Sequence, residues 1–247
     1  MRLVLTVTTP HTELSSRWSL LSIFWSYRGG LFLGFAGKKG TRLVILLHTE
    51  RIRMLQPLTD HLAAAVKVVD AEMPVARNKR SGVPFAAGLG PHSEAETFNL
   101  IVREAERAHP DAYLSVATSV PYPNAPRQRC DLKLTTRTAM LYVEGKLLRL
   151  KGDNGKPNDN MLMHILSPYP HHRSALTDCI KLSKSGFDGQ KAVVILGYDY
   201  PDIPLEPAIL AFEKLASGMI GQRSESPFEA LCHSVHCCGK VMAWLVP

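Results

Sequence analysis

The sequence lacks a long apolar run. A helix that crosses a bilayer needs about 20 consecutive apolar residues, and the one candidate region breaks into two shorter stretches, residues 18–25 and 31–36, around a basic and glycine-rich step. A signal peptide also fits poorly, because Glu13 and Arg17 flank the first stretch and no small-residue cleavage site follows it. We therefore expect no membrane partner, and we expect two short buried strands or a hairpin in this region.

Cysteine is too sparse and too irregular for a disulfide framework. The five cysteines are odd in number, two are adjacent, and none of the spacings is typical of a small secreted domain. We expect a reducing, cytoplasmic compartment. Cys232-His233 and His236-Cys237-Cys238 resemble a metal-ligand pair in spacing. A local zinc site therefore stays open as an alternative, although no second pair accompanies it and a structural zinc usually takes four ligands.

Three common signatures are also missing. The sequence contains no visible internal repeat and no Gly-x-Ser-x-Gly nucleophile elbow. The glycine-containing segment 151–156 has neither the spacing nor the Ser or Thr of a P-loop. These absences argue against a repeat protein, a hydrolase with that elbow and a P-loop nucleotidase.

Acidic residues are scarce in the first third of the chain. Residues 1–92 hold 12 of the 29 basic residues but 5 of the 22 acidic ones, which accounts for the whole net charge of +7. A basic balance favours a polyanionic partner, either nucleic acid or an anionic membrane surface. Solubility alone explains such a balance equally well.

The chain divides into a weakly patterned first part and a clearly patterned second part. Residues 1–92 form a basic N-terminal extension or small subdomain that ends in a basic, turn-rich linker at 77–92. Residues 93–247 form the main domain. Within the first part the patterns predict strands at 3–8 and 42–48 and a helix at 58–69.

The second part begins with a capping box. Ser93 followed by Glu96 is typical of a helix start, and Pro110 lies just beyond the expected helix end near residue 108. An unbroken apolar run at 191–198 is typical of a strand buried on both faces. The order of elements predicts an α/β fold with a mixed central sheet flanked by helices. The other predicted elements are strands at 112–120, 130–136, 139–148 and 240–246, an irregular loop at 121–126, a short helix at 160–166, and helices at 174–185 and 207–217.

Two acidic residues and a lysine interrupt the apolar pattern of neighbouring strands. Asp131 lies near the start of one strand, and Glu144 and Lys146 lie two positions apart on the next, so that they share a face. We expect antiparallel pairing to bring Asp131 beside Glu144, with all three residues at one edge of the sheet and open to solvent. Two such carboxylates can hold Mg²⁺, which activates water and offsets phosphate charge. The lysine can stabilise the phosphate or position the water.

The spacing of Asp131 and Glu144-x-Lys146, with the elements around it at about residues 93–200, resembles the PD-(D/E)XK nuclease superfamily. This resemblance implies a restriction-endonuclease-like core with an N-terminal extension. It also implies a Mg²⁺-dependent endonuclease that hydrolyses the phosphodiester bonds of double-stranded DNA as a homodimer, with a restriction or other defence role. A non-catalytic nucleic-acid-binding protein on the same fold is the alternative, with the basic first part as its binding arm.

The resemblance also implies roles for residues outside the three-residue motif. The main-chain carbonyl of Gly145 is a further metal ligand, and a glutamate on the preceding helix joins the catalytic residues. Glu96 is the expected glutamate, with Glu104 as the other choice, although the capping box accounts for Glu96 by itself. One departure from the family pattern is Cys130, which stands where proline is usual.

Basic residues follow the motif closely. Between Arg127 and Lys156 there are eight Lys or Arg against three acids, and two of those acids are the expected metal ligands. Such residues suit contacts with a phosphate backbone, and a helix start near 171–173 also attracts phosphate. A solvated loop and an ordinary polar cap explain the same residues. The expected nucleic-acid contacts are Arg149, Lys151, Lys156 and Arg173.

Overall fold

The computed structural model describes residues 21–25, 31–35 and 46–247, and the chain divides into two compact units, Met1–Thr49 and Glu50–Pro247. In the first unit, strands β1 (Leu21–Trp25) and β2 (Leu31–Phe35) pair antiparallel. This pairing confirms the hairpin expected in that region. The strand expected at 3–8 lies outside the described residues.

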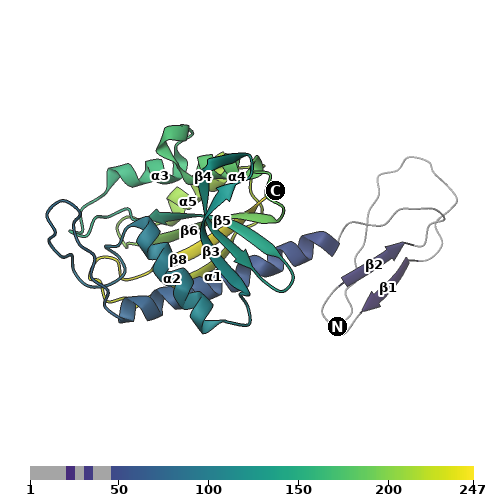
Figure 1. Cartoon of the computed structure of the whole chain (residues 1–247), viewed down its shortest axis with the longest axis horizontal. Coiled ribbons are helices and arrows are strands. Elements are labelled where there is room, and N and C mark those ends of the chain that lie inside the picture. Colours follow the sequence, from purple (N-terminus) through teal and green to yellow (C-terminus); the bar gives the residue numbers. More distant parts are fainter. Residues whose placement is uncertain (1–20, 26–30, 36–45) are drawn as a thin grey trace. The chain divides into compact units, whose positions relative to one another are not determined.

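The second unit is built around a six-stranded sheet with helices on both faces (Figure 1). The strands are β3 (Ser115–Tyr122), β4 (Ala125–Thr135), β5 (Met140–Leu148), β6 (Gln190–Tyr198), β7 (Ser224–Phe228) and β8 (Gly239–Val246). The helices are α1 (Leu46–Ala71), α2 (Glu94–Ala108), α3 (Met163–Leu166), α4 (Ala175–Ser183) and α5 (Glu206–Leu215), with short 3-10 turns at Asp159–Leu162 and Pro170–His172.

The sheet is mixed, as the sequence predicts. Its strand order is β3-β4-β5-β6-β8-β7, and β5 runs parallel to β6 while the other neighbouring strands are antiparallel. Strand β6 lies in the middle of the sheet beside β5, and its residues from Ala192 to Leu196 are 0% exposed. The predicted central position of this apolar strand, next to the strand of Glu144, is therefore confirmed.

Different helices cover the two faces of the sheet (Figure 1). Helices α1 and α2 lie on one face, where Leu62 and Phe98 meet Leu132 around a small apolar cavity of about 10 Å³. Helices α4 and α5 lie on the other, where the ring of Phe212 packs edge-on against that of Trp244, with 5.1 Å between centroids. Both faces of β5 and β6 are thereby removed from water, which is the usual environment of parallel strands.

Helix α1 belongs to the core of the second unit. Leu58, Leu62, Val66 and Val69 recur with helical spacing and are at most 5% exposed. These residues confirm the helix predicted at 58–69 and show that it is longer. The division of the chain falls between Thr49 and Glu50, so it does not coincide with the boundary expected between residues 92 and 93.

The segment at 77–92 resembles a linker in composition but packs as part of the domain. The backbone N–H of Leu89, which is itself 0% exposed, donates a hydrogen bond to Asp70 of α1 over 2.7 Å. Asp70 also accepts a hydrogen bond from the backbone N–H of Cys232. One buried carboxylate therefore joins α1, this segment and the loop before β8.

The turn between β3 and β4 is tighter than the irregular loop predicted at 121–126. Both strands continue to a short turn at Pro123 and Asn124, and Tyr122 lies opposite Ala125. Pro121 is tolerated within β3 because β3 is an edge strand, and an edge strand can lose a backbone donor without breaking the interior of the sheet. The three prolines that predicted a loop therefore lie on a hairpin.

Two further elements differ from the sequence-based expectation. The prediction of a strand at 42–48 is wrong for residues 46–48, which begin α1; residues 42–45 lie outside the described residues. Strand β7 was not predicted, because it has 5 residues and contains Pro227. Each of five further predicted elements is confirmed, and no end differs by more than two residues: 93–108, 139–148, 174–185, 207–217 and 240–246. The short helix predicted at 160–166 is a 3-10 turn at Asp159–Leu162 followed by α3.

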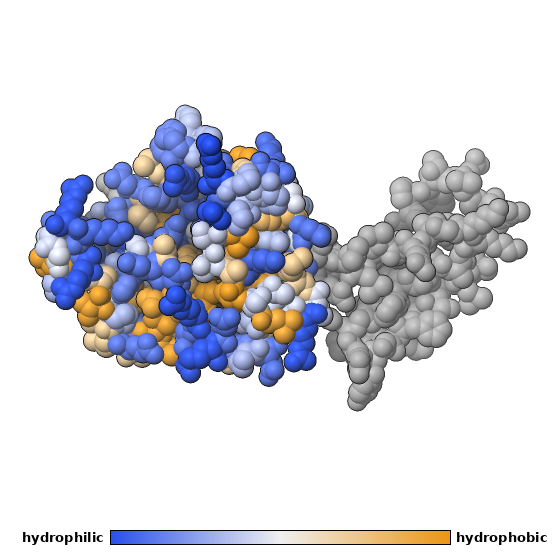
Figure 2. Space-filling view, viewed as in Figure 1, coloured by the Kyte–Doolittle hydropathy of each residue, from blue (hydrophilic) through white to orange (hydrophobic). Residues whose placement is uncertain are grey.

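The visible face of the second unit is mainly hydrophilic, with apolar side chains in smaller patches between polar ones (Figure 2). The large apolar side chains that are exposed, such as Leu114, Tyr169 and Leu210, come from separate parts of the chain. Among the helices that the structure describes, none has both the length and the apolar character that a bilayer crossing requires.

The contact between α1 and the end of α2 should make folding sensitive to acid. The rings of His61 and His109 stack with centroids 3.6 Å apart, and His61 Nδ1 lies 2.9 Å from the Tyr113 hydroxyl. Burial and the neighbouring His109 lower the pKa of His61, with Asp60 opposing them. The folded state therefore binds fewer protons than the unfolded chain near this pKa, and stability falls as the pH drops below about 6.5.

Urea unfolding across this pH range measures the effect. We expect the free energy of unfolding to decrease from neutral to mildly acidic pH, and the His61→Gln variant, which cannot take up this proton, to show a smaller decrease. An identical pH dependence in both proteins would contradict this assignment.

Candidate functional site

The site forms where β4 leaves β5. The two strands pair from Thr135 and Met140 as far as Leu132 and Val143. Strand β5 then continues to Leu148, still paired with β6, whereas β4 turns aside with β3. Backbone N–H groups on this side of β5 thus lose their ladder partners, and buried backbone donors need others.

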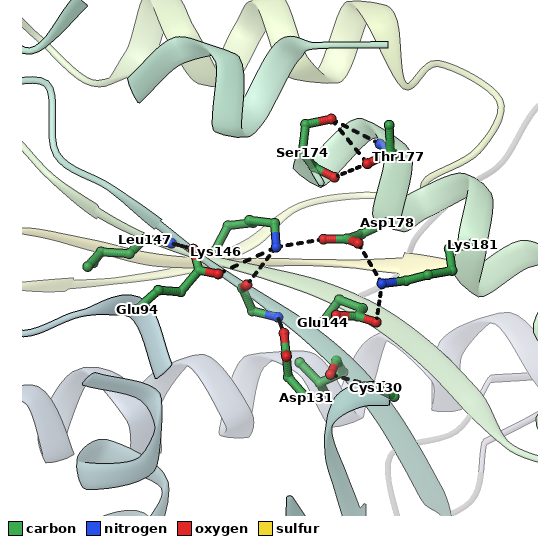
Figure 3. Close-up of polar contacts among 12 residues, drawn as sticks. Glu94, Cys130, Asp131, Glu144, Lys146, Leu147, Ser174, Thr177, Asp178 and Lys181 are labelled. Carbon is green, nitrogen blue, oxygen red and sulfur yellow. Dashed lines mark hydrogen bonds and ion pairs between the residues drawn. The ribbon is translucent and has the colours of Figure 1, made fainter. Parts of the chain in front are cut away.

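Two carboxylates accept the hydrogen bonds that β4 would otherwise take. The N–H of Gly145 donates to Asp131 Oδ2 over 2.8 Å, and the N–H of Leu147 donates to Glu94 Oε2 over 3.0 Å. Glu94 lies in the first turn of α2 and Asp131 lies on β4. Figure 3 shows both side chains reaching toward the same stretch of β5.

These two carboxylates line an open groove between α2 and the β3–β4 pair. The groove has a volume of about 260 Å³. Asp131 is exposed, and the Glu94 side chain is 39% exposed, so both are within reach of solvent. The lining residues are Glu94, Ala95, Phe98, Asn99, Thr118, Ser119, Arg129, Asp131 and Leu132.

The ammonium group of Lys146 lies between the carboxylates of Glu94 and Asp178 (Figure 3). Its Nζ atom is 2.8 Å from Asp178 Oδ2, 3.5 Å from Glu94 Oε1 and 3.3 Å from the carbonyl oxygen of Gly145. Burial by itself would lower the pKa of Lys146, but Asp178 and Glu94 together raise it above the usual range. Lys146 is therefore a cation at neutral pH, although it is 6% exposed.

Glu144 belongs to a buried network on the α4 side of the sheet, which shares Asp178 with Lys146. Glu144 is 2% exposed, accepts a hydrogen bond from the Tyr122 hydroxyl, and lies 2.8 Å from Lys181 Nζ. Lys181 is in turn 2.9 Å from Asp178. Burial and the neighbouring carboxylates of Asp178 and Asp131 raise the pKa of Glu144, and Lys181 offsets only part of this shift.

The expected arrangement of the three motif residues is therefore confirmed in part. Glu144 and Lys146 do point to the same face of β5, since both pair with side chains of α4. They are not at a sheet edge, because β5 has β4 and β6 as neighbours, and they are buried rather than open to solvent. Asp131 lines the groove and Glu144 does not.

The glutamate of α2 that reaches the site is Glu94 and not Glu96. Glu96 accepts hydrogen bonds from Ser93, over 3.1 Å from its backbone N–H and 2.7 Å from its hydroxyl, which completes the capping box. Glu104 pairs with Arg107 over 2.7 Å. The sequence contained one signal for Glu94: once the cap has used Glu96, Glu94 is the remaining acid in the first turn.

The expected phosphate contacts lie outside the groove, and two of them have acidic partners. Lys151 Nζ is 2.6 Å from Asp202 Oδ1, and Arg149 Nη1 is 3.9 Å from Asp153 Oδ1. The sequence missed Arg129, which does line the groove. The remaining two expected contacts are exposed and do not line it: Lys156 and Arg173.

The histidines of the zinc alternative have protein partners. His236 Nδ1 is 2.8 Å from the Tyr200 hydroxyl, and its Nε2 is 2.9 Å from Asp153 Oδ1. His233 Nδ1 accepts hydrogen bonds from the backbone N–H groups of Val235 and His236. All five cysteine thiols are free. These contacts give both histidines a structural role in the loop before β8.

Gly145 allows α2 to approach β5 closely. A Cβ atom at this position would lie 2.8 Å from the ring of Phe98 on α2, closer than such atoms normally come. The residue between Glu144 and Lys146 therefore has to be glycine if the helix is to keep this distance from the strand.

The donors at the groove are of the type that a hard divalent cation prefers. Two carboxylates supply oxygen, and Mg²⁺ commonly takes one or two carboxylates and completes its shell with water and phosphate. The Gly145 carbonyl, expected as a further ligand, instead lies 3.3 Å from Lys146 Nζ, and Gly145 does not line the groove. No cluster of three or more His, Cys, Asp or Glu side chains suited to a metal occurs within residues 46–247 or the described hairpin. Asp131 and Glu94 thus fit an ion shared with water and substrate rather than one enclosed by protein.

Comparison of the chain with known protein families, curated proteins and solved structures finds no match. The chemistry of the site is therefore inferred from its own residues.

Replacing Glu144 and Asp131 should affect stability very differently. Glu144→Ala leaves the Tyr122 hydroxyl without its buried acceptor, and a buried polar group left unsatisfied costs up to about 3 kcal/mol. Lys181 keeps Asp178, 2.9 Å away, as its partner. Asp131→Ala removes one hydrogen bond at an exposed side chain and costs about 1 kcal/mol. Urea unfolding of both variants measures the difference. Equal losses would contradict the separation of the two carboxylates into a buried network and an open groove.

Proposed function

We propose that the chain is a Mg²⁺-dependent nuclease whose reaction takes place in the groove at Asp131 and Glu94. The observation that carries this proposal is that these two solvent-accessible carboxylates accept hydrogen bonds from the N–H groups of Gly145 and Leu147, which β4 no longer pairs, with a buried lysine cation beside Glu94. Acids placed this way are preorganised, because each has one oxygen fixed by the backbone.

The residues of the groove would divide the work between binding and charge stabilisation. Asp131 and Glu94 would hold the ion. When bound, Mg²⁺ lowers the pKa of water and neutralises charge that develops on phosphate. The backbone donors of Gly145 and Leu147 keep both carboxylates oriented while this happens.

Lys146 would act as a fixed positive charge. Because Asp178 and Glu94 raise its pKa, it cannot serve as a general base near neutral pH. Its side chain is 7% exposed and does not line the groove, so its charge would act through Glu94, 3.5 Å away, on the negative charge that develops in the groove. Such preorganised charges contribute strongly to catalysis. Asp178 orients the ammonium from the buried side.

The order of elements supports the restriction-endonuclease-like reading of the core. Helix α2, the strands β3, β4 and β5, helix α4 and strand β6 follow one another as the resemblance to PD-(D/E)XK nucleases implies. In this proposal Glu94 takes the metal-ligand role that the motif spacing gave to Glu144.

The proposed substrate is nucleic acid, because the chain has a net charge of +7, which lies in residues 1–92, and phosphate contacts dominate the affinity for nucleic acid. DNA is proposed from the resemblance to PD-(D/E)XK nucleases. Double-stranded DNA, a homodimer that supplies one site per strand, a defence role and a cytoplasmic location remain parts of this proposal. The five free thiols accord with a reducing compartment.

One observation favours the non-catalytic alternative. Glu144, an acid of the motif, is turned away from the groove and held by Tyr122 and Lys181, so the groove contains fewer acids than the sequence implies. Nicking of supercoiled plasmid with and without Mg²⁺ distinguishes the two functions. DNA binding without ion-dependent nicking would identify a binding protein.

The two glutamates at the start of α2 provide a matched test. Glu94→Gln should lower the rate of Mg²⁺-dependent DNA cleavage by about 100-fold or more, because it removes a proposed ligand. Glu96→Gln removes the same charge two positions later, and glutamine also serves in a capping box, so it should leave the rate unchanged. Equal rates for both variants, or a loss only with Glu96→Gln, would refute the assignment of Glu94.

Lys146 and Lys181 provide a second matched pair. Lys146→Met should lower the cleavage rate by about 10²–10³-fold, as expected for a positioned electrostatic group, with little change in Mg²⁺ affinity. Lys181→Met removes a cation that pairs with Glu144 and Asp178, so it should lower the free energy of unfolding more than the cleavage rate. Asp178→Asn weakens the hold on the Lys146 ammonium, so it should lower kcat and leave KM nearly unchanged. Cleavage by Lys146→Met at the wild-type rate would show that the lysine is structural.

A further inference from the structure

The groove is lined by further side chains that the proposed reaction does not use. They are Asn99 of α2, Thr118 and Ser119 of β3, and Arg129 of β4. These four side chains can donate hydrogen bonds, and three of them are uncharged. The groove therefore combines these hydrogen-bond donors, one of them a cation, with the apolar side chains of Ala95, Phe98 and Leu132.

Arg129 is held toward this groove but has no acidic partner within the described part of the chain. It is exposed, and its Nη1 donates a hydrogen bond to the carbonyl of Ser119 over 3.4 Å. Ser119 has a φ of +56°, so it departs from the extended conformation of the strand. By contrast, Arg149 and Lys151 lie near the carboxylates of Asp153 and Asp202.

A guanidinium group without an acidic partner beside a site for phosphate chemistry suits a second phosphate. Its planar donors match two phosphate oxygens at once, which a lysine cannot do. Asp131, Glu94 and Arg129 all line the same groove. A ligand bound in this groove could therefore contact the two carboxylates and Arg129 together.

We propose that Arg129 binds a backbone phosphate next to the scissile one, and that Asn99, Thr118 and Ser119 contact the same nucleotide. The ligand class is the phosphodiester backbone of a nucleic-acid strand. This inference rests on the proposed function, because that function places the scissile phosphate at Asp131 and Glu94. It assigns the substrate contact to Arg129, in place of the expected Arg149 and Lys151.

Arg127 supplies the control. It lies two positions before Arg129 on β4, is also exposed and loses the same charge when replaced, but it does not line the groove. Arg129→Gln and Arg127→Gln would be compared with the wild-type chain by fluorescence anisotropy. The probes are labelled DNA in single- and double-stranded form and RNA of the same sequence, in EDTA so that no cleavage occurs, over a range of salt concentrations.

We expect Arg129→Gln to weaken binding about tenfold and to reduce the slope of log affinity against log salt by about 1, the effect of losing one phosphate contact. Arg127→Gln should leave the slope unchanged. Arg129→Lys should keep the slope and lose part of the affinity, because it keeps the charge without the paired donors. Equal losses for Arg129→Gln and Arg127→Gln, or no binding of any probe by the wild type, would overturn the proposal.

Cleavage in Mg²⁺, measured separately, distinguishes this inference from the proposed function. Binding that depends on Arg129 without any cleavage would support the phosphate site and reject the nuclease. Cleavage with the same KM for the wild type and Arg129→Gln would support the nuclease and reject the phosphate site.

Discussion

The buried ammonium of Lys146 is the constraint on which the site depends. A cation that is 6% exposed needs compensating charge close by, and it finds Asp178 on one side and Glu94 on the other. Those two acids come from α4 and α2, helices on opposite faces of the sheet. Lys146 therefore links the two helical layers through the strand that lies between them.

The separation of β4 from β5 turns this electrostatic requirement into an accessible site. If the ladder continued, the N–H groups of Gly145 and Leu147 would face a strand. Because it ends at Leu132 and Val143, side-chain carboxylates replace backbone carbonyls as acceptors. The same change opens the groove, so the local loss of sheet structure and the gain of functional groups have one cause.

The sequence predicted most of the fold because its strongest signals are local or periodic. The apolar run of β6, the capping box of α2 and the helical spacing in α1 each reflect an environment that the sequence pattern reports directly. Prolines near the β3–β4 turn misled the prediction, because their tolerance depends on β3 being an edge strand. That position follows from the complete sheet order and not from the segment itself.

The candidate site was less predictable for a similar reason. Strand periodicity correctly placed Glu144 and Lys146 on one face, but it does not say which partners cover that face. Lys181 and Tyr122, far away in the sequence, enclose Glu144. The sequence analysis favoured Glu96 over Glu104 and overlooked Glu94, because the hydrogen bond between Glu94 and the N–H of Leu147 joins elements that only the folded chain brings together.

Gly145 occupies the position between Glu144 and Lys146 that the motif leaves unspecified. Here its missing side chain sets the distance between α2 and β5, because the Phe98 ring fills the space where a Cβ atom would lie. An alanine at residue 145 would push the helix outward and move Glu94 away from the N–H of Leu147. The apparently free position of the motif thus acts as a spacer that fixes the width of the groove, and its tolerance to substitution is set by a helix some 50 residues earlier in the chain.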